Sequence, residues 1–281
     1  MNSGDFFFER DPFSPIQYAY KITRRLHQEL SGKQEIEVVE SPYFGRMLLL
    51  DGVVQATERD EFFYHEMLVH VPLHAHGQAR RVLIIGGGDG GSLREVLRYP
   101  NVDQVVLVEY DERVIEVSKS FLPTMSVGFE DQRTQIFYED GTEFLKLARD
   151  PFDVVIVDST DPVGSAVGLY SSTFLNRAFE ALASNGILVM QTESLHFHRE
   201  LVVEVQQKLK EVFPIVDLYT QALSTYAGNW WTFSIASKLE DPRVVRQQTS
   251  VSTRYYSPDV HSWAFLPGSL YNRLMNLSLK W

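Results

Sequence analysis

The chain has 281 residues, 44% of them hydrophobic, with a formal net charge of −11 at pH 7 and no cysteine. The lack of cysteine excludes disulfides, thiolate metal sites and cysteine nucleophiles, and the acidic balance disfavours nucleic acid and anionic membranes as partners. No apolar run approaches the roughly 18 residues of a membrane span, and no secretory signal is visible at the start, so we expect a cytoplasmic protein.

The first sixty residues predict a small amino-terminal β domain. Residues 35–41 alternate apolar and polar side chains, and residues 46–57 form two apolar runs joined by Asp51-Gly52. Asp-Gly between such runs is a strong hairpin signal, because a type I′ turn needs positive φ at both positions. We place this domain at residues 1–60.

A helix is predicted to begin near Thr57. Thr57 and Asp60 approximate a capping box, and the acidic residues around Glu61 suit the positive amino end of a helix. Pro72 lies near the expected end of this helix.

From Val82 onward, apolar strands alternate with helical patterns, which predicts an α/β fold with a mostly parallel sheet covered on both faces. The last two strands have only a short link, which favours an antiparallel final strand. We therefore expect a Rossmann-like catalytic domain at residues 61–281. The predicted strands lie at residues 82–85, 105–109, 134–139, 152–158, 186–191, 216–221 and 230–237.

Three successive strand ends carry residues that suit a nucleotide. A glycine-rich turn that includes Gly86 and Gly88 follows the first strand, and Glu109 ends the next, where it can bind ribose hydroxyls. Asp140-Gly141 follows the third strand, towards the adenine edge. The ligand is a dinucleotide or an S-adenosyl compound, and seven strands with a late antiparallel pair favour the second.

Asp89 lies inside the glycine-rich turn. Its carboxylate would repel a pyrophosphate and also the carboxylate of ordinary S-adenosylmethionine, whereas a ligand with an ammonium group there would be attracted. The same side chain is equally suited to cap the following helix.

Asp158 and Asp161 follow the fourth strand. One carboxylate can accept a proton from an amine nucleophile while the other holds the ammonium form. A single loop aspartate is more often a turn residue, but a pair at a ligand-facing edge favours an acidic binding pocket. The loop continues through Pro162, Gly164 and Gly168, a pattern typical of a lid.

Glu193 ends the fifth strand at the same edge, where it can hold a distal ammonium. The spacing of Glu193, His196 and His198 matches no zinc pattern, so we predict no metal. Tyr64 and His65, on the helix after the hairpin, either line the pocket or pack within the core.

Several segments together carry a family resemblance over nearly the whole chain. The chain resembles the polyamine aminopropyltransferase family, closest to its spermidine synthases. The segments are LDGVVQATERDEFFYHEMLVHVPL at residues 50–73, VLIIGGGDGGSLREV at 82–96, the strand ending in Glu109, Asp140-Gly141, and DSTDPVG at 158–164.

The resemblance implies transfer of an aminopropyl group from decarboxylated S-adenosylmethionine to putrescine, which gives spermidine and methylthioadenosine. It implies a small β domain on a methyltransferase-like Rossmann domain, a homodimer or homotetramer, and no bound prosthetic group. The nucleoside is then a co-substrate, and the partner is a small-molecule polyamine.

The resemblance also implies a role for each matching residue. Asp158 is the general base and Asp161 anchors the amine, while Asp89 binds the aminopropyl ammonium. Gln34 and His65 touch the nucleoside, Glu109 binds the ribose, and Asp140 and Gly141 bind the adenine; Gln55, Tyr64 and Tyr226 shape the amine channel.

Four positions depart from the family pattern around the lid and amine channel: Ser165, Val167, Ser224 and Ala227. These departures leave the acceptor open to agmatine, cadaverine or a longer polyamine. A methyltransferase on the same fold and a polyamine-sensing relative without turnover are the alternatives in other functional classes.

Overall fold

The computed structural model describes residues 5–11, 14–161, 164–246 and 251–276. Its strands are β1 Phe6–Arg10, β2 Gln17–Lys21, β3 Arg24–Leu30, β4 Glu35–Ser41, β5 Gly45–Leu50, β6 Val53–Thr57, β7 Arg81–Gly86, β8 Gln104–Glu109, β9 Thr134–Tyr138, β10 Phe152–Asp158, β11 Leu182–Ser194, β12 Ile215–Ala222 and β13 Trp230–Ser237. Its helices are α1 Glu61–His76, α2 Gly91–Leu97, α3 Glu112–Phe121, α4 Gly141–Leu147, α5 Ser172–Ala181, α6 Arg199–Val212, α7 Pro258–Ala264 and α8 Gly268–Met275, with 3₁₀ turns η1 Ser126–Glu130 and η2 Gly164–Tyr170. Within these ranges, none of the helices has the length and apolar character needed to cross a bilayer.

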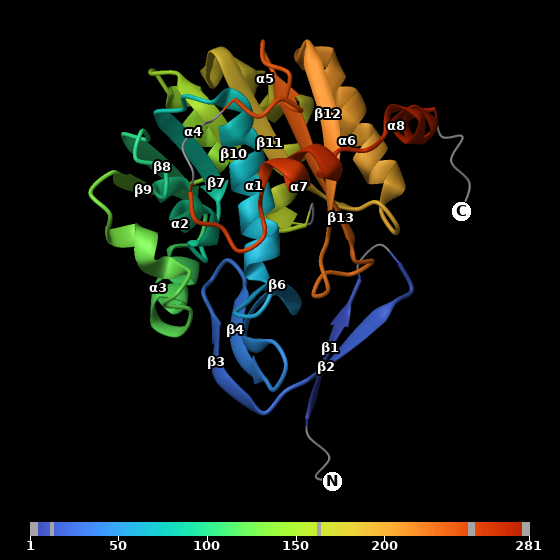
Figure 1. The fold of residues 1–281 in the computed structure, drawn as a ribbon. Coiled ribbons are helices and arrows are strands. Elements are labelled where there is room, and N and C mark those ends of the chain that lie inside the picture. The colour runs from blue at the N-terminus through green and yellow to red at the C-terminus, as the bar shows by residue number, and fades with distance from the viewer. Residues whose placement is uncertain (1–4, 12–13, 162–163, 247–250, 277–281) are drawn as a thin grey trace.

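The first six strands form two small antiparallel sheets, β1–β2 and β3–β4–β5–β6. Figure 1 shows both sheets, in blue, below the larger part of the molecule. The turn between β5 and β6 has φ of 49° at Asp51 and 77° at Gly52. The predicted hairpin is thus confirmed, with the positive φ at both positions that a type I′ turn requires.

The large sheet has seven strands in the order β12-β13-β11-β10-β7-β8-β9. Its neighbours from β11 through β10, β7 and β8 to β9 are parallel, whereas β13 runs antiparallel to both β11 and β12. Both the seven-stranded sheet and its antiparallel final strand are confirmed. The architecture is therefore the predicted α/β fold preceded by a small amino-terminal β domain.

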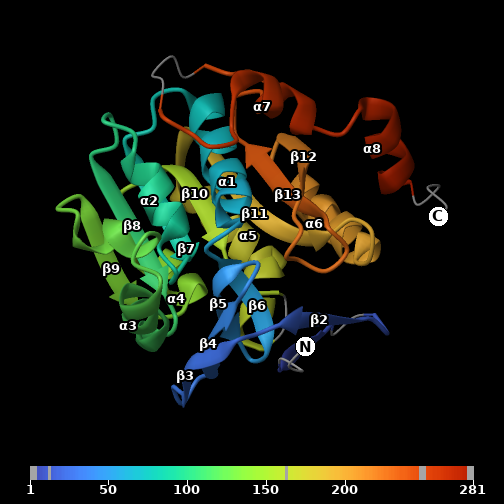
Figure 2. The same ribbon diagram turned by 60° about the horizontal axis from the view of Figure 1, so that its bottom comes forward.

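Two cores cover the two faces of this sheet because successive strand side chains alternate. On β7, Val82 and Ile84 pack into the core beneath α1, α2 and α7, while Leu83 and Ile85 pack into the core beneath α4, α5 and α6. The two sets of helices lie on opposite sides of the sheet in Figure 2. Burial on both faces explains why the strands are continuous apolar runs.

The predicted helix near Thr57 begins later, at Glu61. Thr57 is the last residue of β6, and its hydroxyl donates to Asp60 Oδ1 at 2.6 Å while accepting the Asp60 N–H at 3.3 Å. These bonds form a turn before the helix and occupy the Asp60 side chain, which makes no capping bond to α1. The helix also continues past Pro72 to His76.

The carboxyl ends of the parallel strands face the small sheets. Strand β7 ends at Gly86, β8 at Glu109 and β10 at Asp158, so the three motifs found in the sequence meet at one edge of the sheet. Ligands bind at this edge in open α/β sheets.

Candidate active site

A cavity of about 500 Å³ lies between the strand ends of the large sheet and the small sheets. The small sheets contribute wall residues such as Leu50 and Gln55, and the large sheet contributes the loops after β7, β8 and β10. The predicted site residues on its wall are Gln34, Gln55, Tyr64, Gly86, Gly88, Asp89, Glu109, Asp140, Gly141, Asp158, Asp161, Glu193 and Tyr226. His65 is the one predicted site residue that does not line it.

Glycines let the loop after β7 pack closely against the ends of β10 and β8. Gly86 has φ of 82°, and a Cβ there would stand 2.1 Å from the Asp158 carbonyl oxygen. The Gly87 N–H donates to that same oxygen at 2.8 Å. A Cβ on Gly88 would stand 2.8 Å from Glu109 Oε2. Side chains at Gly86 and Gly88 would therefore separate the loops or displace the carboxylate that forms the cavity wall.

Glu109 is fully buried at the end of β8. Burial raises its pKa to about 7, and the nearby carboxylates of Asp111 and Asp158 add to the shift. The Asp111 N–H donates to Glu109 Oε1 at 2.9 Å, and the Asp111 carboxylate accepts a bond from Gln34 Nε2 at 3.0 Å. Asp111 thus links Gln34, in the turn between β3 and β4, to Glu109 at the end of β8.

Asp140 and Gly141 lie at the start of α4. Asp140 Oδ1 caps this helix by accepting the N–H groups of Thr142 at 2.8 Å and Glu143 at 3.1 Å. A Cβ on Gly141 would stand 2.4 Å from the Ile85 side chain, so only glycine lets the helix start pack this closely against β7. The cap keeps this part of the cavity wall rigid.

Asp89 makes the cap that the sequence allowed and also lines the cavity. Its Oδ1 accepts the Gly91 N–H at 2.6 Å at the start of α2 and lies 3.4 Å from His65 Nε2. Burial opposes ionisation, but the charge and side-chain contact of His65 together with the Gly91 N–H outweigh it and lower the pKa of Asp89. Both contacts use Oδ1, which leaves Oδ2 for a ligand.

Asp158 lies at the centre of the site. The Tyr64 hydroxyl donates to its Oδ1 at 2.8 Å, while its Oδ2 is buried and makes no hydrogen bond of standard geometry with the described residues. Burial raises the pKa of Asp158, and the Asp89 carboxylate raises it further. A carboxylate oriented by one hydrogen bond, with its other oxygen unused, is suited to accept a proton.

Beyond Asp158 the cavity ends in a cluster of acidic groups. Burial and the neighbouring Glu193 raise the pKa of Asp161 well above its usual range, and burial raises the pKa of Glu193 to about 7. His198 Nδ1 lies 3.0 Å from Glu193 Oε2 at this end. Neighbouring like charges favour the protonated form of both acids, whereas a nearby cation favours the ionised form. This end of the cavity is therefore suited to an ammonium group.

The amino-terminal strands supply two carboxylates that the sequence analysis missed, Glu9 and Asp11. Glu9 accepts the Val54 N–H at 3.0 Å, its Oε2 lies 3.1 Å from the Tyr20 hydroxyl oxygen, and burial raises its pKa to about 7. Asp11 lies 3.1 Å from His198 Nε2. Both line the cavity. The available signal was that Glu9 alternates onto the same buried face of β1 as Phe7.

Tyr226 belongs to the loop between β12 and β13. Its hydroxyl donates to the Gln55 carbonyl oxygen, and its ring packs edge-on against Tyr64 with 5.6 Å between centroids. Gln55, Tyr64 and Tyr226 come from three separate elements and meet on one wall of the cavity.

His65 lies behind Asp89. Its ring nitrogens lie 2.7 Å from Glu61 and 3.4 Å from Asp89, and its side chain is almost fully buried. A Cβ on Gly91 would stand 2.3 Å from the imidazole, so the ring is seated directly against the start of α2. The structure therefore separates His65 from the cavity by one layer of side chain.

The four departures from the family pattern have different positions. Ser224 donates to Asp60 Oδ2 at 2.7 Å, a bond that a proline at this position cannot make. Ala227 lines the cavity, whereas Val167 is 53% exposed. Pro162 and the side chain of Ser165, part of the predicted lid, lie outside what the structure describes.

The arrangement has one wall suited to a nucleoside, with Gln34, Glu109 and the start of α4. It has an acidic end with Asp161 and Glu193, and Asp158 lies between them. Carboxylates at both ends favour cationic ligands, and the central base can take a proton from one of them.

Comparison with known proteins gives a consistent match over the chain. The family model described as spermine/spermidine synthase domain matches residues 61–248, and that described as spermidine synthase tetramerisation domain matches residues 6–58. Polyamine aminopropyltransferase 1 of Aquifex aeolicus is 54% identical over 275 residues, which cover 98% of this chain and 98% of that protein.

Two further comparisons agree with this match. The polyamine aminopropyltransferase of a Hydrogenobaculum species is 51% identical over 276 residues, covering 98% of this chain and 99% of that protein. A crystal structure of spermidine synthase in complex with the transition state analogue AdoDATO superimposes with a TM-score of 0.92 at 33% identity, covering 98% of this chain and 96% of that chain.

Proposed function

Since the chain belongs to the spermine/spermidine synthase family and is a transferase, we propose that it transfers an aminopropyl group from decarboxylated S-adenosylmethionine to putrescine. The products are spermidine and methylthioadenosine. The observation that carries this proposal is Asp158, a buried carboxylate between a nucleoside wall and an acidic wall, with one oxygen held by Tyr64 and the other without a hydrogen bond of standard geometry from the described residues.

The donor occupies the wall formed by the ends of β7, β8 and β9. Glu109 and Gln34 bind the ribose side, and Asp140 and Gly141 border the adenine. Asp89 receives the aminopropyl ammonium, where the carboxylate of ordinary S-adenosylmethionine would be repelled. The likeness to a spermidine synthase solved with AdoDATO supports a donor of this class.

The acceptor occupies the acidic end. Its reacting nitrogen lies near Asp158, and its distal ammonium is held by Asp161 and Glu193. Tyr64, Gln55 and Tyr226 form the channel between these points. Glu9 and Asp11 add negative charge at the same end, which favours an acceptor with two cationic groups.

In the reaction, the lone pair of the acceptor nitrogen forms a bond to the aminopropyl carbon attached to sulfur. The carbon–sulfur bond breaks and its electron pair returns to sulfur, so that the sulfonium becomes the neutral thioether of methylthioadenosine. The proton that the acceptor nitrogen loses passes to Asp158. The sulfonium is already a good leaving group, so alignment of the two substrates supplies a large part of the acceleration.

We also propose that the protein assembles as a homo-oligomer through its amino-terminal strands. Phe6 and Phe8 of β1 are 51% and 56% exposed on one face of the β1–β2 sheet. The match of residues 6–58 to a tetramerisation domain supports this assembly.

The test of the proposed reaction is a product assay with a panel of amines. Purified protein is incubated with decarboxylated S-adenosylmethionine and putrescine, cadaverine, agmatine or spermidine, and methylthioadenosine is measured with the new polyamine. We expect equal amounts of methylthioadenosine and spermidine, with the highest kcat/KM for putrescine. A different preferred amine would replace putrescine, and an absence of product with every amine would reject aminopropyl transfer.

A further inference from the structure

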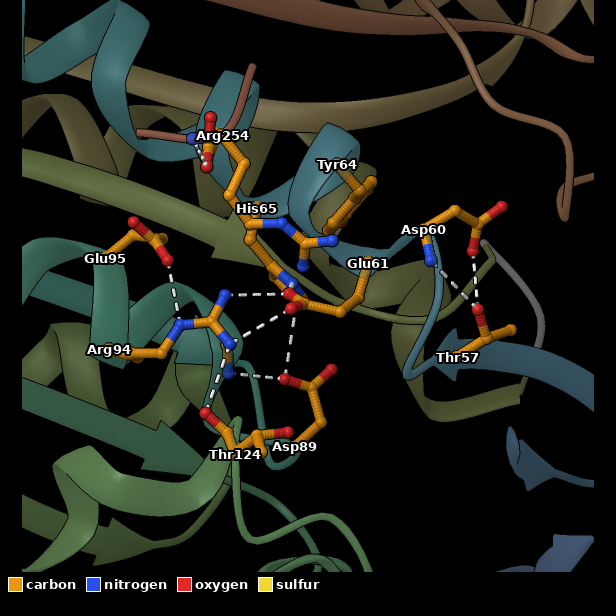
Figure 3. Close-up of polar contacts among 12 residues, drawn as sticks. Thr57, Asp60, Glu61, Tyr64, His65, Asp89, Arg94, Glu95, Thr124 and Arg254 are labelled. Carbon is orange, nitrogen blue, oxygen red and sulfur yellow. Dashed lines mark hydrogen bonds and ion pairs between the residues drawn. The ribbon is translucent and has the colours of Figure 1, made fainter. Parts of the chain in front are cut away.

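Four charged side chains form a continuous ion-pair network, mostly buried, behind the cavity wall. It runs from Arg94 on α2 through Glu61 and His65 on α1 to Asp89 in the loop after β7, as Figure 3 shows. Of these four, Asp89 lines the cavity, while Glu61, His65 and Arg94 do not. The roles assigned above to cavity residues leave these three unexplained.

Each contact in this network joins specific atoms. Arg94 donates to both oxygens of Glu61, at 3.0 Å and 2.8 Å, which is the bidentate geometry that guanidinium and carboxylate prefer. Glu61 Oε2 lies 2.7 Å from His65 Nδ1, one helical turn along α1. The other ring nitrogen, Nε2, faces Asp89 Oδ1 at 3.4 Å.

Neighbouring groups hold both ends of the ion-pair network in place. Arg94 also bonds to Glu95 Oε1 at 2.8 Å and to the Thr124 carbonyl oxygen at 3.2 Å. At the other end, His65 is seated against Gly91, where no Cβ can be accommodated. The imidazole therefore cannot move towards α2 without displacing the start of that helix.

The charges in the ion-pair network favour the imidazolium form of His65. Glu61 from α1 and Asp89 from the β7–α2 loop face its two nitrogens, and Asp158 at the end of β10 adds a more distant negative charge. Burial opposes the charged ring, but Asp89 and Glu61 outweigh it and raise the pKa of His65 well above its ordinary value. With both nitrogens protonated, the ring is a cation whose Nε2 lies 3.4 Å from Asp89 Oδ1, within ion-pair distance.

We propose that Glu61 and Arg94 are positioning residues, which hold the imidazolium of His65 against Asp89 and so keep that carboxylate ionised and oriented for the aminopropyl ammonium of the donor. This inference rests on the proposed function, because it assigns a use to Asp89 in donor binding. If Glu61 loses its charge, His65 becomes neutral more readily. A neutral ring with its proton on Nδ1 turns a lone pair towards Asp89, which then protonates or rotates away.

The test uses Glu61→Gln in the full-length protein, with two readouts. The first is the NMR titration of labelled histidine between about pH 6 and about pH 9, with the His65 signal assigned through His65→Gln. We expect no titration of His65 in the wild type and a clear titration in Glu61→Gln. This readout needs no substrate, so it tests the ion-pair network separately from the proposed reaction.

The second readout is the ratio of affinities for decarboxylated S-adenosylmethionine and methylthioadenosine, which lacks the ammonium. In Glu61→Gln we expect this ratio to fall about tenfold at high pH and to recover as the pH falls and His65 gains its proton, whereas the wild-type ratio stays flat. Arg94→Met releases the bidentate hold on Glu61 but also removes a cation that opposes protonation of His65, so we expect a smaller fall in the ratio than in Glu61→Gln. Arg94→Lys, which keeps the charge but not the bidentate bond, should recover part of the ratio.

The matched control is Glu66→Gln, on the same helix. Glu66 is also buried, but it accepts the backbone N–H groups of residues 254–256 and does not contact His65. This variant should lower thermal stability without changing the His65 titration or the affinity ratio. An unchanged titration of His65 in Glu61→Gln, or an affinity ratio unchanged in both Glu61→Gln and Arg94→Met, would contradict the proposal.

Discussion

Glu109 shows at the scale of one residue how the site is kept ready for a ligand at a cost in stability. Its carboxyl group is buried beside other acids, which raises its pKa from 4.5 to about 7. Between these values the folded protein binds a proton that the unfolded chain does not. The contribution of Glu109 to stability is therefore fully present below about pH 4.5 and is lost as the pH rises through about 7.

This sign gives a prediction for Glu109→Gln. The amide keeps an acceptor for the Asp111 N–H but carries no charge, so at pH 8 the variant should melt higher than the wild type, on the order of 5 °C. At pH 5 the gain should be nearly absent, and affinity for methylthioadenosine should fall at both values. Calorimetric melting at the two pH values checks this, with the exposed Glu143→Gln as control. An equal gain at both pH values would contradict the electrostatic explanation.

At the scale of one element, the loop between β12 and β13 ties the acceptor channel to three other parts of the fold. The Ser224 and Thr225 hydroxyls both donate to Asp60 at the start of α1, and the Tyr20 hydroxyl donates to the Thr225 carbonyl oxygen at 2.7 Å. The Gly228 N–H donates to the Tyr18 hydroxyl at 3.0 Å. These bonds set the position of Tyr226 on the channel wall.

Loss of the Ser224 bond should loosen this loop without touching the donor. We expect Ser224→Ala to raise KM for the amine about threefold to tenfold, as the loss of one hydrogen bond implies, with KM for the donor unchanged. Steady-state kinetics with each substrate varied in turn measures both values. Ser120→Ala, whose hydroxyl bonds within α3 far from the site, is the control. Equal effects of Ser224→Ala on both KM values would show that the loop does not act on the acceptor alone.

The elements differ in how well local sequence specifies them. Buried parallel strands are apolar on both faces, so β7, β8 and β10 and the motifs at their ends are visible without a structure. The predicted contact between Thr57 and Asp60 is present, but it closes a turn before α1, which begins later than predicted, at Glu61. The Asp60 carboxylate also accepts bonds from Ser224 and Thr225. These two partners lie more than 160 residues away, beyond the reach of any local pattern.

The same limit applies to the site. Nine of the thirteen predicted residues that line the cavity lie at strand ends of the large sheet, which must meet at one edge. The other four come from other elements and were assigned through the family resemblance: Gln34, Gln55, Tyr64 and Tyr226. Glu9 and Asp11 were missed since the packing of the small β1–β2 sheet on the large one is a long-range event. The position of His65 behind Asp89 also depends on how α1 and α2 pack, through Gly91.

At the scale of the whole molecule, the exposed phenylalanines of β1 predict an assembly. Phe6→Ser together with Phe8→Ser should shift the mass measured by light scattering to a smaller species, because apolar faces of this kind are covered in stable oligomers. Trp263→Ser is the control, since Trp263 on α7 is 78% exposed but outside the matched tetramerisation segment. An unchanged mass in the double variant, or an equal loss in the control, would place the contact elsewhere.

The proposed reaction depends on one carboxylate, Asp158, that accepts a proton while the cavity aligns two cations. The most direct measurement is single-turnover formation of methylthioadenosine and spermidine by the wild type and by Asp158→Asn, both saturated with decarboxylated S-adenosylmethionine and putrescine. We predict that the wild type forms the two products in equal amounts and that Asp158→Asn is slower by about 10²–10⁴-fold, while methylthioadenosine still binds. A near-normal rate in Asp158→Asn would contradict the role of Asp158 as the proton acceptor.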